Sequence, residues 1–271
     1  MQVAASIHTR LVSGPCVVRR QLNPEAGAGV AGGPRCLLTG MFRTLRSPED
    51  KSRRSAQTMV DVELQHIVRL APNARSSYRD AFAHGQPVLD AAGISASALR
   101  VTHFMAQVLH ECGGLTIQFE NLNYSAARLP KVWPRRFRPT GPLDPALYAN
   151  NAEKLANEVY GGRLGNTAPG DGFRFRGRGM LQVTGRDGYR QVSAELRRHD
   201  PTAPDFETDP DLVISADWAL KVAAALWTWK GCNAFADSDS VEKVTQRING
   251  GQIGIADRKD WLRRCKALWL P

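Results

Sequence analysis

Apolar residues recur at helical spacing along most of the chain from about residue 58 onward. The strongest segment spans about 98–112, where Ser95 or Ser97 can cap a helix. Its apolar stripe consists of Val101, Phe104, Met105, Val108, Leu109 and Cys112. Further helices are predicted at about 145–159, 189–199, 215–230, 240–248 and 256–269. In the helix at 215–230, Ser215 is the expected cap, and Trp218, Val222, Leu226 and Trp229 are expected to face inward.

A glycine-rich stretch interrupts the helical pattern, with nine glycines between residues 161 and 188. Within it, Phe173, Arg174, Phe175 and Arg176 alternate with period two, which predicts a short strand or hairpin. The predicted fold class is therefore mainly α with a small Gly-rich β-hairpin.

The first 56 residues differ from the rest in composition and charge. The chain has a net charge of +10, and residues 1–56 hold nine basic and three acidic side chains, a net of +6. They are rich in Gly, Ala, Pro and Arg, which predicts a basic disordered segment. A second interpretation is that they precede a true start at Met41 or Met59. No apolar stretch typical of a secretory signal follows the first charges, so we expect a cytoplasmic protein until it is released or exported.

Several classes of protein are excluded or disfavoured by the composition of the chain. No apolar run approaches the roughly 18 residues of a membrane span, so membrane insertion is excluded. Five widely spaced cysteines without a CxxC pair predict reduced thiols rather than a disulfide framework. A zinc HExxH motif would need histidine where Gly114 stands. His103 and His110 fall opposite the apolar stripe and are expected to lie at the surface or behind the site.

Two glutamates in the most informative stretch suggest acid–base chemistry. Glu111 lies at the edge of the apolar stripe of the helix at 98–112, where lost hydration favours a neutral acid. Gly113 and Gly114 let the chain turn, so that Glu120 can return across a cleft. Two carboxyl groups beside a groove are the minimal equipment for glycoside hydrolysis. Taken alone, two glutamates nine residues apart are more often solvated surface groups.

Four blocks, in order, together resemble glycoside hydrolase family 19: HECGG, FENLNYSAARL, GFRFRGRGMLQVTGRDGYR and QRINGGQIGIADR. The resemblance runs from about residue 60 to the C-terminus and makes residues 57–271 a family 19-like catalytic domain. It implies an α+β lysozyme-like fold, with two helical lobes around a substrate cleft. It also implies an endo-acting, inverting enzyme that cleaves β-1,4 bonds next to N-acetylglucosamine in chitin or peptidoglycan. No cofactor or metal is implied, and a monomer is expected.

The same resemblance assigns roles to individual residues. The family's general acid falls on Glu111 and its general base on Glu120, with the carboxyl groups about 6.5–9.5 Å apart to admit a water. Thr184 matches the hydroxyl that helps to hold this water. The implied sugar-binding residues are Tyr124, Gln182 and Asn249. Arg258 matches an arginine expected near the acidic pair, where it would lower the pKa of the base, and Trp133 is expected either in the cleft wall or in the core.

One departure from the family pattern leaves an alternative open. Many relatives have an asparagine where Gly188 precedes Tyr189, and that residue assists the water-holding network. A wall-glycan-binding protein that has lost catalysis is therefore the alternative to an enzyme. Nucleic-acid binding through the basic segment is a third hypothesis, which the lack of interleaved aromatic residues disfavours.

Overall fold

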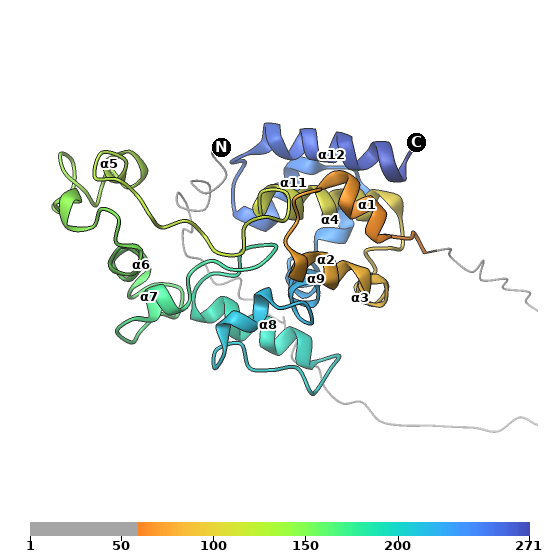
Figure 1. Ribbon diagram of the computed structural model, residues 1–271, viewed down its shortest axis with the longest axis horizontal. Coiled ribbons are helices and arrows are strands. Elements are labelled where there is room, and N and C mark those ends of the chain that lie inside the picture. The colour runs from red at the N-terminus through yellow and green to blue at the C-terminus, as the bar shows by residue number, and fades with distance from the viewer. Residues whose placement is uncertain (1–58) are drawn as a thin grey trace, which may run out of the picture. The chain divides into compact units, whose positions relative to one another are not determined.

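The computed structural model describes residues 59–271, and these form a mainly α-helical unit (Figure 1). The α-helices are α1 (Leu64–Leu70), α2 (Ser76–Ala83), α3 (Gln86–Ala91), α4 (Ala98–Glu111), α5 (Leu129–Val132), α6 (Ala152–Tyr160), α7 (Asp171–Arg174), α8 (Arg186–Arg197), α9 (Ala219–Trp229), α10 (Cys232–Asp237), α11 (Val241–Asn249) and α12 (Ile255–Trp269). Two 3₁₀ helices span Pro145–Leu147 and Pro210–Ile214. The mainly α fold class is confirmed. The prediction for residues 1–56 lies outside the described residues.

Helix α4 is the centre of the larger hydrophobic core. The Ser97 hydroxyl accepts a hydrogen bond from the Arg100 amide at 3.2 Å, so the expected cap is present. Every residue from Val101 to Glu111 is buried, because α10, α11 and α12 pack against α4 and cover the face that was expected to be exposed to water. The surface position predicted for His103 and His110 is therefore wrong. His103 bonds Asp239 at 2.8 Å, and His110 bonds Asp257 at 2.6 Å.

A second, smaller hydrophobic core belongs to residues 122–160. It contains side chains of α5, of α6 and of the loops beside them: Leu122, Tyr124, Leu129, Trp133, Phe137, Leu155, Ala156, Val159 and Tyr160. Two hydrophobic cores are what a two-lobed helical fold requires. No helix among residues 59–271 is both long and apolar enough to cross a membrane.

The Gly-rich segment contains less β structure than its pattern predicts. Phe173 and Arg174 belong to the single helical turn α7, so the predicted strand at 173–176 is wrong. The arginines instead stack on rings, and the Arg176 guanidinium lies 4.0 Å from the Phe173 ring centroid and 4.8 Å from that of Phe119. Among the described residues, pairing is limited to isolated bridges, including Arg178 with Val183 and Phe119 with Arg178. These bridges place the loop of Glu120 against residues 177–183.

Candidate active site

Glu111 is the last residue of α4 and is 8% exposed. Gly113 and Gly114 follow with positive φ angles of 55° and 66°, a left-handed backbone that glycine adopts at little cost. The chain therefore leaves the helix directly after Glu111. The carboxyl group stays at the helix end, on the wall of a cavity.

Arg258 of α12 binds the Glu111 carboxylate. The guanidinium is fully buried, and it donates to Oε1 of Glu111 and to the side-chain oxygen of Gln107. Such pairing compensates the desolvation that two buried charges would otherwise suffer. The expectation that Arg258 lies near the acidic residues is thus met at Glu111.

Arg258 is not among the main influences on the pKa of Glu120. Burial raises the pKa of Glu120, and the opposing influences are the Gly177 amide, the Tyr160 hydroxyl and the charges of Arg176 and Arg178. The charges of Arg176 and Arg178, two arginines of the Gly-rich segment, lower the pKa of Glu120 in the way that was expected of Arg258.

Glu120 is partly buried and held from two sides. The Gly177 amide donates to Oε1 at 2.7 Å, and the Tyr160 hydroxyl donates to Oε2 at 2.8 Å. The Glu120 amide also donates to the Gly177 carbonyl at 3.0 Å. Burial and the Glu120 charge raise the pKa of Tyr160 well above its ordinary value, so Tyr160 remains a hydrogen-bond donor.

A cavity of about 380 Å³ joins several of the predicted residues, since Glu111, Gln182, Thr184 and Asn249 all line it. Gly177 connects this cavity to Glu120. From the position that a Cβ of Gly177 would occupy, Gln182 Oε1 lies at 2.8 Å, Thr184 Oγ1 at 3.1 Å and Glu120 Cβ at 3.4 Å. These three side chains therefore converge on one point, and any side chain at position 177 would fill it.

Tyr124 and Trp133 are placed differently from the other predicted sugar-binding residues. Both are 8% exposed and belong to the smaller core, where their rings meet edge to face with centroids 5.1 Å apart. The structure thus gives Trp133 the core position of the two that were expected. Burial raises the pKa of Tyr124, and the charge of the Glu120 carboxylate raises it further.

The cavity wall also includes Trp229, Lys230 and Arg247, which the sequence did not place at the site. Trp229 was expected to face inward but is 49% exposed, because α9 ends at the cavity. Gly188 also lines this cavity. A Cβ there would meet Val183 Cγ1 at 3.5 Å, an ordinary contact, so the position has room for a side chain.

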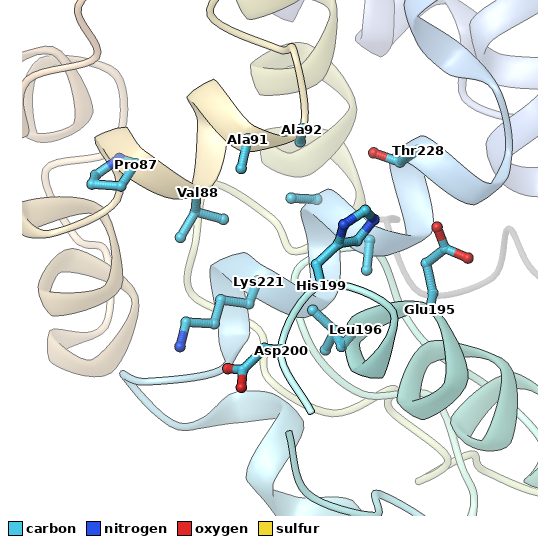
Figure 2. Close-up of a pocket in the computed structure, with 12 residues that line it drawn as sticks. Pro87, Val88, Ala91, Ala92, Glu195, Leu196, His199, Asp200, Lys221 and Thr228 are labelled. Carbon is cyan, nitrogen blue, oxygen red and sulfur yellow. The ribbon is translucent and has the colours of Figure 1, made fainter. Parts of the chain in front are cut away.

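A second cavity, of about 260 Å³, lies between α3, α8 and α9 (Figure 2). Its walls are mostly apolar, and the lining residues also include the ionisable side chains of Glu195, His199, Asp200 and Lys221. None of the predicted site residues lines it. The candidate chemistry therefore belongs to the cavity of Glu111.

Glu111 lies on the wall of the cavity, and Glu120 lies beside Thr184, whose hydroxyl belongs to that wall. Two carboxyl groups beside a cavity are the catalytic groups that a glycoside hydrolase requires. The chain is 41% identical over 157 residues to a Haemophilus influenzae protein described as a glycosyl hydrolase family 19 domain-containing protein. The match covers 57% of this chain and 72% of that relative. The chain belongs to glycosyl hydrolase family 19.

Other comparisons give weaker similarities. No family model matches the chain. The crystal structure of chitinase C from Streptomyces griseus HUT6037 is 17% identical with a TM-score of 0.49, and the match covers 77% of this chain and 76% of that one. A bacterial family 19 chitinase is 20% identical with a TM-score of 0.47, covering 77% and 94% of the two chains. Family membership rests on the Haemophilus relative.

Proposed function

We propose that this protein is an endo-acting glycoside hydrolase that cleaves β-1,4 bonds next to N-acetylglucosamine in a cell-wall polysaccharide, chitin or peptidoglycan. The observation that carries the proposal is the convergence of Glu120, Thr184 and Gln182 around Gly177, beside the cavity that Glu111 lines. The enzyme acts as a monomer and reaches the wall after release or export.

In the proposed reaction, bond breaking and bond making occur in one step. For this step Glu111 takes up a proton, in place of the charge that it carries in the ion pair with Arg258. It then gives this proton to the leaving glycosidic oxygen as the bond from the anomeric carbon to that oxygen breaks. Glu120 takes a proton from a water that attacks the opposite face of the same carbon, which inverts its configuration. Thr184 Oγ1, next to Glu120, orients the water. Hydrogen bonds from Gly177 and Tyr160 stabilise the carboxylate form that a base requires.

The two roles can be separated with substrates that differ in their leaving group. Glu111→Gln should lower turnover of the polymer about 10²–10⁴-fold, but much less for an aryl glycoside whose leaving group needs no proton. Glu120→Gln should lower the turnover of both substrates. The exposed Glu153→Gln on α6 is the matched control and should behave as wild type.

The products distinguish this mechanism from its rivals. NMR of the initial product should show the α-anomer, and an initial β-anomer would contradict inversion. Polymer binding without hydrolysis by the wild type would favour the inactive glycan-binding alternative. Gly188, which replaces the asparagine of many relatives on the cavity wall, would then be the first position to restore.

A further inference from the structure

One wall of the Glu111 cavity is basic. Trp229 and Lys230 stand at the C-terminal end of α9, and Arg247 stands in the last turn of α11. The Lys230 ammonium donates to the Arg247 backbone carbonyl at 3.0 Å, which joins the two helix ends. Within residues 59–271, neither Lys230 nor Arg247 forms an ion pair with a carboxylate. We call Trp229, Lys230 and Arg247 the basic wall.

The acidic groups on the same cavity already have cationic partners. Glu111 is paired with the buried Arg258, and Asp187 with Arg190 at 3.1 Å. Apart from these two acids and the two cations of the basic wall, no side chain that lines this cavity is charged at neutral pH. The cavity therefore carries positive charge that the described residues do not neutralise.

The Lys230 ammonium has lost part of its hydration, which a negatively charged ligand could replace. Burial lowers the pKa of Lys230, because the ammonium has lost hydration, and the charge of Glu111 is among the influences that oppose this. Lys230 is thus electrostatically coupled to the proposed acid. A carboxylate bound here would replace part of the lost hydration with a charge-assisted hydrogen bond.

Trp229 adds an apolar surface next to these cations. Its side chain is 49% exposed on the cavity, and the Lys230 ammonium lies 5.4 Å from its ring centroid. An exposed indole at the edge of a polar cavity offers a flat face to the carbon–hydrogen face of a sugar ring. The wall therefore presents a platform for a sugar with two cations beside it.

We propose that the basic wall binds a carboxylate on a sugar substituent, so that the substrate is an acidic wall glycan of the peptidoglycan type rather than uncharged chitin. In such a glycan, every second sugar carries a lactyl ether that ends in a carboxylate or in an acidic peptide. Chitin offers the same backbone bonds without this charge. The inference rests on the proposed hydrolase function and chooses between its two polymers.

The test compares soluble peptidoglycan fragments with chitin oligomers of equal sugar number, using the full chain. The wild type should have the larger kcat/KM on peptidoglycan fragments. Lys230→Met and Arg247→Gln should each lower the ratio of peptidoglycan to chitin kcat/KM about 10- to 100-fold, the effect of one lost charge-assisted hydrogen bond. Lys243→Gln is the matched control, since Lys243 is exposed on α11 and does not line this cavity.

The kinetic results either support or overturn the proposed binding of a carboxylate by the basic wall. A wild type that prefers chitin oligomers, or variants that lower both activities equally, would overturn it. Because Lys230 is partly buried, thermal unfolding of each variant is measured, and the exposed Arg247→Gln gives the same test without risk to the core. If the wild type hydrolyses neither polymer, the proposed function fails. Sedimentation with insoluble peptidoglycan and with chitin then tests the basic wall, and equal binding to both polymers would overturn the inference.

Discussion

At the scale of single residues, Tyr160 controls the ionisation of the proposed base. Its hydroxyl donates to Glu120 Oε2 at 2.8 Å and stabilises the carboxylate. Tyr160→Phe removes that donor, so the pKa of Glu120 should rise further above its ordinary value. The base must be ionised, and the acidic limb of the kcat/KM profile should therefore move to higher pH. On this limb we expect a loss of about 10-fold, the effect of one hydrogen bond to a charged group.

A matched tyrosine separates this effect from a general loss of packing. The Tyr148 hydroxyl donates to Glu158 at 3.4 Å, away from the Glu111 cavity. Tyr148→Phe should leave the pH profile in place. A Tyr160→Phe profile that superimposes on the wild type would show that Tyr160 only fills space.

The residues that define the candidate site could be predicted only in part. Glu111 and Glu120 are found from their motifs, because each sits in a run of neighbours that resembles the family. Arg258 was also expected near the acidic pair, but only from the family resemblance, since it is 147 positions from Glu111 and the packing of α12 on α4 brings the two together. Tyr160 and Lys230 have no local signal, because each matters only through another segment of the fold.

At the scale of elements, the same lesson applies to helices and strands. The apolar stripe and the Ser97 cap predicted α4 almost to the residue, since both are local properties. The Phe–Arg alternation from Phe173 to Arg176 misled, because the arginines stack on aromatic rings instead of pointing to water from a strand. Periodicity reports which positions are apolar, and it cannot report that neighbouring helices also cover the polar face.

Helices α4 and α12 are joined by two adjacent pairs of side chains. His110 bonds Asp257, and the next residues in each helix, Glu111 and Arg258, form the buried ion pair. Gly254, which precedes α12, lies so close to the His110 ring that a Cβ there would approach Cε1 to 2.4 Å. The close contact of α12 with His110 therefore sets the position of α12 along α4, and with it the position at which Arg258 meets Glu111.

Asp257→Ala tests this register. Loss of a hydrogen bond to a buried histidine should lower the free energy of unfolding by about 1–3 kcal/mol. It should also lower kcat, because Arg258 no longer holds the Glu111 carboxyl group in one place. Urea unfolding and steady-state kinetics measure the two effects. Asp260→Ala on the same helix removes only an exposed pair with Arg263 and serves as the control. Equal effects of both substitutions would refute a special role for the His110 contact.

At the scale of the whole molecule, most of the net positive charge lies in a part of the sequence that contains no candidate site residue. All the candidate site residues lie between 111 and 258, within the described unit, whereas residues 1–56 contribute +6 of the net charge of +10. Charges outside an active site change the encounter with an anionic polymer more than they change the chemical step. Binding to the wall and turnover should therefore respond differently to removal of the first 56 residues.

Deletion of residues 1–56 should weaken binding to an insoluble anionic wall polymer at low salt, with little change in kcat on short soluble fragments. The remaining residues carry a net charge of only +4, so binding should also fall less steeply with ionic strength than that of the full chain. The contrast should fade above about 0.5 M salt, where screening reaches only a few ångströms. Sedimentation across a salt series measures the slopes. If binding falls with salt equally steeply for the two proteins, the folded unit alone makes the electrostatic contact, and the basic wall of the Glu111 cavity would then be its most direct source.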